Sequence, residues 1–276
     1  MPNPRTPADE MFERYLAAHA FQFQYEPDIE AELAIETSRR PDYLVVSAVG
    51  RAICEVKQLE TRTLSQRTAG QTGAFFISDK EQFGPLRASI IDKAEQLRPL
   101  AGTGTPLVIV LANSPAGSDF ALDDEHVLSA LWGNPKITFT IDRSTGAAVG
   151  GPQNKLSDYG VLCSRQPDGT WANVHPHIAA VVTLHERTLE QDWIGERFRE
   201  RGHPLPDLAA ALAQAKRRDV EIEEARAAGE IPQGTYQWVE VYDTDGAEAD
   251  PLPTDLFAGA RDRRFGFFPD HTYGER

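Results

Sequence analysis

Two short β-rich runs lie close together in the first quarter of the chain, Tyr43–Val46 and Ala52–Val56, joined by a segment that contains a glycine. Runs of this length and composition, separated by such a turn, are typical of a β-hairpin. Charged residues stand where apolar ones would pack better: Asp42 heads the first run, and Glu55 and Lys57 end the second. The pattern therefore predicts a hairpin that carries charged side chains for a reason other than packing.

The alternation of side chains along a strand decides which of these groups can meet. Glu55 and Lys57 share one face of their strand, whereas Cys54 and Val56 share the other. If the turn closes near the glycine, Asp42 comes opposite Glu55 at the open end of the hairpin. Two carboxylates this close repel each other unless a cation lies between them, and hard divalent cations prefer such oxygens together with water. With a lysine nearby, this composition suits the hydrolysis of a phosphodiester.

A purely structural explanation of the same residues stays open. Pro41-Asp42 is an ordinary turn dipeptide. A Glu-x-Lys pair on a solvated strand face is common and is worth only about a few tenths of a kcal/mol. The chemical interpretation is favoured because the three charged residues occur in this order on adjacent strands, after one predicted helix and before another.

The flanking sequence predicts an α/β arrangement. A helix is expected over residues 6–19, a half-exposed strand over 21–27, a helix over 85–102 and a buried strand over 105–113. Residues 58–84, between the hairpin and the second helix, have no sustained period and are expected to form a long connection. The predicted order is thus helix, three strands, helix and strand.

The second half of the chain is less regular. Two helices and three strands are predicted, over residues 123–133, 206–230, 136–142, 177–186 and 236–243. The tail, residues 261–276, mixes basic and aromatic residues and is expected to pack only in part. Since we find no internal repeat and no Pro/Gly-rich linker, we expect residues 114–276 to form an α+β extension, packed as one domain onto a core of residues 1–113.

Charge and cysteine content limit the partners and the compartment. The 276 residues carry a formal net charge of −14, which disfavours nucleic acid as a partner because phosphates attract Lys and Arg. Residues 37–100 are an exception, with ten basic and seven acidic residues and hence a local charge of +3. The chain has two cysteines, no apolar run long enough for a membrane span and no signal-peptide pattern. We therefore expect a cytoplasmic protein without membrane contact.

The stretch PDYLVVSAVGRAICEVK resembles the signature of the PD-(D/E)xK nuclease superfamily, whose shared core is a four-stranded mixed sheet flanked by helices. The resemblance covers about residues 6–113 and implies a restriction-endonuclease-like mixed β-sheet core. By position, it makes Asp42 the motif aspartate, Glu55 the second acidic ligand and Lys57 the motif lysine. It also implies Mg²⁺ or Mn²⁺ as cofactor, with the backbone carbonyl of Val56 as a further ligand.

Members of the superfamily often place a glutamate on the first helix, facing the site. Glu10 and Glu13 are one turn apart on the predicted first helix, and Glu10 is preferred because its spacing to the following apolar residues is closer to that of the family. Some members also carry a polar residue on the later helix, where Lys93 and Gln96 are candidates for substrate binding. For this second pair, a solvated helix face is the preferred explanation.

Together, these residues imply metal-dependent hydrolysis of phosphodiester bonds, in DNA more than in RNA. Asp42 and Glu55 would hold the ion, and Lys57 would position or activate the attacking water. Glu10 would orient Lys57 or help to bind a second ion.

Arg62 and Arg67 lie in the long connection and would approach the phosphate backbone. The implied partner is nucleic acid, and a homodimer is compatible with the resemblance. A different class of function stays open, a catalytically inactive nuclease-like domain that acts as a nucleic-acid-binding or assembly module. The acidic net charge favours this alternative, whereas the intact set of Asp42, Glu55 and Lys57 favours the enzyme.

Overall fold

The computed structural model describes residues 4–33, 40–59, 79–113, 122–133, 135–146, 148–156, 160–165, 171–199, 208–246, 248–267 and 273–276. The chain forms two compact units. One comprises Met1–His185 together with Trp238–Arg276, and the other comprises Glu186–Gln237.

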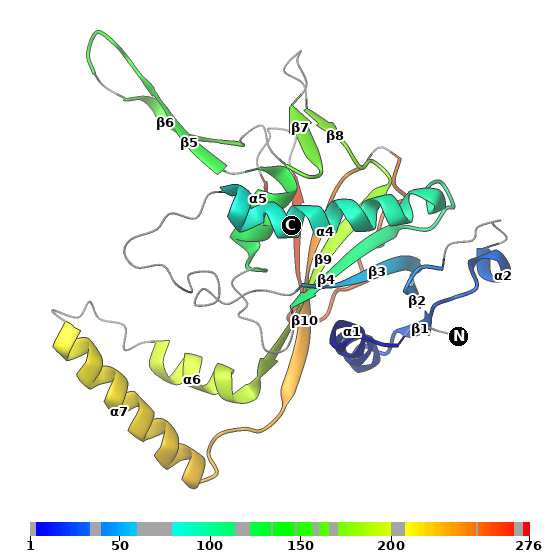
Figure 1. Cartoon of the computed structure of the whole chain (residues 1–276). Coiled ribbons are helices and arrows are strands. Elements are labelled where there is room, and N and C mark those ends of the chain that lie inside the picture. The colour runs from blue at the N-terminus through cyan, green and yellow to red at the C-terminus, as the bar shows by residue number, and fades with distance from the viewer. Residues whose placement is uncertain are drawn as a thin grey trace. The chain divides into compact units, whose positions relative to one another are not determined.

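A mixed sheet of eight strands organises the larger unit (Figure 1). In chain order, the strands are β1 (Gln22–Tyr25), β2 (Tyr43–Val46), β3 (Arg51–Leu59), β4 (Leu107–Asn113), β9 (Ile178–Thr188), β10 (Thr235–Asp243), β11 (Arg263–Phe267) and β12 (Tyr273–Glu275). Each strand pairs with the next in this order. β1, β2 and β3 are antiparallel neighbours, whereas β3, β4 and β9 run parallel. The predicted mixed α/β class is confirmed, and the restriction-endonuclease-like fold stays a prediction.

The predicted hairpin is confirmed as β2 and β3. Its turn closes with a hydrogen bond of 2.8 Å from the backbone N–H of Ser47 to the carbonyl of Gly50. A Cβ atom at Gly50 would lie 2.9 Å from Cγ of Pro253, so the close approach of this ring requires glycine at the turn. Because β4 and β9 pair directly, the sheet continues across the predicted boundary after residue 113. That boundary itself stays a prediction.

Helices cover both faces of the sheet (Figure 1). α1 (Pro7–Ala18) begins with a capping box, in which Thr6 and Asp9 bond to each other's backbone N–H groups. Its apolar face, which includes Phe12, packs in one cluster with Cys54. Truncation of such a buried ring, as in Phe12→Ala, is expected to cost about 3 to 5 kcal/mol. Ile53, the residue before Cys54 in β3, belongs to a second apolar cluster, on the opposite face of the sheet.

That opposite face is covered by α4 (Asp79–Leu97), which continues into the 3₁₀ helix η1 (Arg98–Leu100), and by α5 (Asp124–Trp132). The helix was predicted to begin at Pro85, but α4 begins at Asp79 and holds this proline in its interior. The prediction was wrong because proline costs a helix interior one hydrogen bond but does not always end or begin a helix. β3 likewise extends into the expected connection, as far as Leu59.

In the second half of the chain, all five predicted elements are present. They are α5, β5 (Pro135–Ile141), β9, α7 (Leu208–Ala227) and β10. Elements that the sequence did not predict are α2 (Ile29–Leu33), β6 (Ala148–Leu156), β7 (Cys163–Arg165), β8 (Trp171–Asn173), α6 (Leu189–Arg199), β11 and β12. β5 pairs with β6 and β7 with β8, so four of the strands form two small separate sheets.

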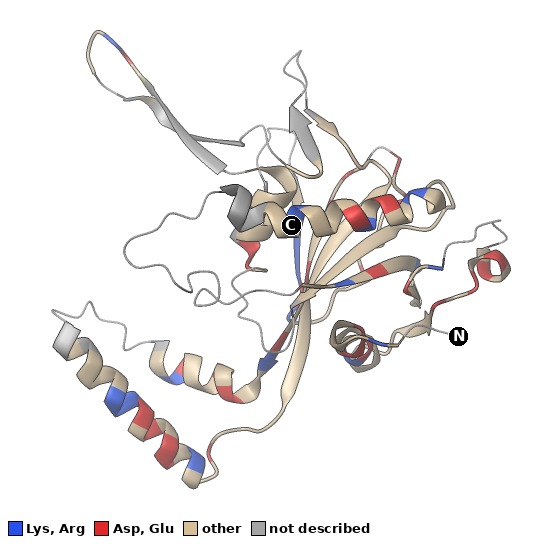
Figure 2. Cartoon of the chain, in the orientation of Figure 1, with Lys and Arg blue, Asp and Glu red and all other residues tan. Residues whose placement is uncertain are grey.

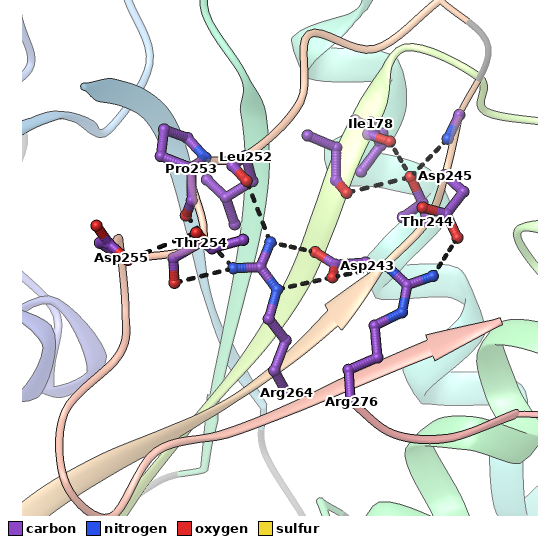
Figure 3. A network of polar contacts seen from close by, with 12 residues as sticks. Ile178, Asp243, Thr244, Asp245, Leu252, Pro253, Thr254, Asp255, Arg264 and Arg276 are labelled. Atoms are coloured by element: carbon purple, nitrogen blue, oxygen red, sulfur yellow. Dashed lines mark hydrogen bonds and ion pairs between the residues drawn. The ribbon is translucent and has the colours of Figure 1, made fainter. Parts of the chain in front are cut away.

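The described residues of the C-terminal tail form two strands of the sheet that the sequence did not predict. β11 runs parallel to β10, and β12 pairs with β11. Arg264 donates two hydrogen bonds of 2.7 Å to the carboxylate of Asp243 and further bonds to the backbone carbonyls of residues 252–254 (Figure 3). Arg276 reaches Asp243 at 3.3 Å and Asp245 at 2.6 Å. Asp243, Asp245, Arg264 and Arg276, here called the C-terminal network, hold the tail against the sheet.

The smaller unit contains α6 and α7. Lys and Arg lie beside Asp and Glu along α7 (Figure 2), as is usual for a solvated helix face. Arg226, near its end, lies 2.6 Å from Glu190 of α6. Within the described parts of the chain, no helix combines the length and the apolarity that crossing a membrane requires.

Candidate active site

Asp42 and Glu55 come together at the open end of the β2–β3 hairpin. Tyr43 pairs with Cys54, so Asp42, the preceding residue, stands opposite Glu55. The backbone N–H of Val56 donates to Oδ2 of Asp42 at 2.8 Å and holds this carboxylate against β3. Glu55 is only 6% exposed. The structure thus brings the two predicted carboxylates together.

Lys93 of α4 supplies a cation at this point. Its Nζ lies 2.7 Å from Oε2 of Glu55 and 3.7 Å from Oδ2 of Asp42. It also donates to Oε1 of Gln96 at 3.0 Å, and Gln96 in turn donates to Asp92 at 2.9 Å. Only 13% of the Lys93 side chain is exposed. The solvated helix face that the sequence favoured is therefore wrong for this residue.

The spacing of the later helix contains a signal that identifies Lys93 as buried. Lys93 follows Ile90 by three residues and precedes Leu97 by four, and both of these side chains are fully buried. Residues three and four apart lie on the same side of a helix. A lysine within an apolar stripe therefore faces the sheet, where it needs a partner of opposite charge.

Burial and charge act against each other in this site. Burial, followed by the charge of Asp42, raises the pKa of Glu55 to about 7, although Lys93 opposes the rise. Burial also lowers the pKa of Lys93, but the charges of Glu55 and Asp42 outweigh it, and the net shift is upward. Two carboxylates thus share one ammonium. Lys93 therefore offsets only part of the cost of burying Glu55 in its charged form.

Lys57 lies two residues beyond Glu55 on β3. Ile53 and Leu59 belong to the apolar cluster under α4. Glu55 and Lys57 follow Ile53 at every second position of β3, so their side chains point to the same face. Lys57 is half-buried. Among the described residues, the ion pairs of the two carboxylates are made by Lys93 and not by Lys57.

The candidate glutamates of α1 lie on the other face of the sheet. α1 packs with Cys54 and Val56, whose side chains point away from Glu55. Glu13 pairs with Arg5 and accepts a hydrogen bond of 3.1 Å from the hydroxyl of Tyr43. Glu10 is exposed on α1, and no contact described in the structure links it to the carboxylate pair. The structure therefore does not bring Glu10 into the site, and its role stays a prediction.

Arg62 and Arg67, which were expected to approach the phosphate backbone, lie outside the described residues. Their role as phosphate contacts stays a prediction.

The oxygens of the site fit a hard divalent cation. Two carboxylates and the adjacent carbonyl of Val56 are the ligand type that Mg²⁺ and Mn²⁺ accept, with water completing the coordination. Over the described residues, no group of three or more His, Cys, Asp or Glu side chains is placed to hold a metal ion. An ion here would therefore depend on Asp42 and Glu55 as its side-chain ligands.

Comparison with known proteins assigns no family to the chain. No protein-family model, no curated protein and no solved structure matches it. The residues and distances of the site itself are therefore what supports a function.

Proposed function

We propose that this chain is a metal-dependent nuclease that hydrolyses phosphodiester bonds, in DNA more than in RNA. The observation that supports it most is the meeting of Asp42 and Glu55 at the open end of a hairpin, where the backbone N–H of Val56 holds the carboxylate of Asp42. The proposal includes a restriction-endonuclease-like core and a cytoplasmic protein with nucleic acid as its partner. It is compatible with a homodimer.

In this proposal, Asp42, Glu55 and the carbonyl of Val56 hold Mg²⁺ or Mn²⁺. A divalent ion supplies charge stabilisation to phosphate oxygens in the transition state. Lys57, half-buried on the same face, positions or deprotonates the attacking water. Lys93, on the helix that covers this face, offers a further positive charge to the phosphate.

Cleavage assays of the wild type and Lys57→Ala, on linear and circular DNA and on RNA with Mg²⁺, Mn²⁺ or EDTA, test this proposal. We expect metal-dependent cleavage by the wild type and a loss of about a hundredfold or more in Lys57→Ala, without a change in its unfolding transition. Arg51→Ala is the matched control, because Arg51 is exposed at the other end of the same strand. Full activity or unfolding of Lys57→Ala contradicts the assigned role.

A second candidate is a non-catalytic module that binds nucleic acid or a protein assembly. The net charge of −14 favours it, as does the ammonium of Lys93, which already neutralises part of the carboxylate pair. Thermal unfolding in Mn²⁺ separates the two candidates. A metal site gains stability as RT ln(1 + [L]/Kd), whereas a module without one shows no shift.

A further inference from the structure

We infer that Lys93 is an internal cation that competes with the divalent ion for Asp42 and Glu55, so that the ion binds only when the Lys93 ammonium leaves the carboxylates. The inference rests on the proposed function and deepens it, because it names the residue that regulates metal occupancy. It concerns a residue 38 positions away from Glu55 in the chain.

The position of the ammonium is the first argument. Nζ of Lys93 is within hydrogen-bonding distance of Oε2 of Glu55 at 2.7 Å, and it lies 3.7 Å from Oδ2 of Asp42. A divalent ion requires these same two carboxylates as ligands, at about 2.0 to 2.6 Å from their oxygens. An ammonium and a doubly charged ion on the same oxygens repel each other strongly in a buried site. The two cations therefore exclude each other.

The second argument is that Lys93 has another partner when it leaves. Gln96 accepts from Nζ at 3.0 Å and is itself bonded to the exposed Asp92 on the same helix. A lysine has four rotatable bonds and a compact charge, so Nζ can keep Gln96 and move away from the carboxylates without a change of the helix. Asp92, one residue before Lys93, offers negative charge near this second position.

The third argument is the charge of the metal-free site. Without Lys93, Asp42 and a nearly buried Glu55 would face each other with no positive charge between them, which is costly. Lys93 thus keeps the carboxylates in place while no ion is bound. Replacing it is expected to weaken the metal-free protein and to strengthen metal binding, and these opposite effects distinguish competition from a merely structural role.

Calorimetric titration with Mn²⁺ and thermal unfolding with and without Mn²⁺ test the inference on the full chain. Lys93→Met is expected to bind Mn²⁺ at least about tenfold more tightly than the wild type. It should also unfold at a lower temperature in EDTA and show the larger Mn²⁺-induced rise in Tm. Arg98→Met removes the same charge from an exposed position near the end of the helix, and its affinity should equal that of the wild type.

Lys93→Arg extends the test to a variant that keeps the charge and the fold. A guanidinium can bind the carboxylates through two N–H groups, so it competes more strongly and should weaken Mn²⁺ binding. Affinity in Lys93→Met that equals or falls below that of the wild type overturns the inference, as does an equal gain in Arg98→Met. Affinity in Lys93→Arg at or above the wild-type value overturns it too.

The result also separates this inference from the proposed function. If the wild type binds Mn²⁺ and the Lys93 variants bind it equally well, the competition is refuted and the metal site stands. If none of the folded proteins binds Mn²⁺, the metal site and the competition both fall.

Discussion

Two polar regions of the same sheet differ in their ratio of negative to positive charge. In the candidate site, the carboxylates of Asp42 and Glu55 share the single ammonium of Lys93. In the C-terminal network, Asp243 receives two hydrogen bonds of 2.7 Å from Arg264 and a third contact, at 3.3 Å, from Arg276. The candidate site has more negative than positive charge, whereas the C-terminal network matches Asp243 and Asp245 with Arg264 and Arg276.

The difference is what we expect between a proposed binding site and a purely structural ion-pair network. The guanidinium of Arg264 also donates to backbone carbonyls, so its hydrogen-bonding groups are used within the protein. A buried ion pair whose N–H donors are all bonded within the protein has no donor left to bind a ligand. In the candidate site, burial, followed by the charge of Asp42, raises the pKa of Glu55, and a perturbed group of this kind is typical of functional sites.

The largest expected effect comes from Glu55→Gln. In the proposed nuclease, the amide would keep the shape of the side chain but remove a charge that would hold the ion, so cleavage should fall by about a thousandfold. Folding should be retained, because a neutral group is easier to bury than a carboxylate. kcat/KM and urea unfolding measure the two effects. Cleavage within about tenfold of the wild type would show that the two regions do not differ in function.

Arg264→Ala should have the opposite profile. It leaves Asp243 buried with a weaker partner and removes the donors of three carbonyls, so the free energy of unfolding should fall by about 3 kcal/mol. Metal-dependent cleavage per folded molecule should not change. Urea unfolding at constant pH measures the loss, and Arg264→Lys, which retains the charge, should lose less. A fall in kcat/KM of the folded fraction would contradict the separation.

A pH-dependent effect is expected near the C-terminal strands, at His185 of β9. The ring is 6% exposed, bonds to Thr183 through Nε2 at 2.8 Å and stacks on Trp238. Burial, followed by the charge of Arg263, lowers its pKa to about 4, although the charge of Asp124 opposes this.

The sign of the effect follows from proton binding. Between about pH 6.5 and about pH 4, the unfolded chain binds a proton at His185 and the folded chain does not, so stability falls as the pH falls. From about pH 7 to about pH 5, the loss should be about 2 kcal/mol. Urea unfolding of the wild type and of His185→Gln measures it. Equal slopes in the two proteins would rule out a contribution from this histidine.

The smallest effect is expected from Arg98→Ala. Arg98 lies 2.7 Å from Glu95, as close as the pairs of the two buried regions, but about half of each side chain is exposed. Water and salt screen such a pair, so the midpoint of urea unfolding should not move measurably. A clear shift would show that distance, and not burial, sets the strength of ion pairs in this protein.

Most of the local elements could be predicted from periodicity. Two short β-rich runs joined by a turn with a glycine correctly predicted the hairpin, and the caps and spacing predicted α1. Short elements such as α2 were missed because a single turn carries little signal. The longer helix α6, of 11 residues, was missed as well. The start of α4 was misplaced because residues 58–84 show no sustained period, although the last of them belong to the helix.

By itself, the sequence determined the pairing of Asp42 with Glu55, because a hairpin register follows from a short turn and alternating strands. Only the tertiary structure decided that Lys93 is the cation between them and that α1 carries Glu10 on the other face. It also placed β11 and β12 in the sheet. These contacts join residues far apart in the chain, and they depend on the packing of whole helices and strands, which local periodicity does not encode.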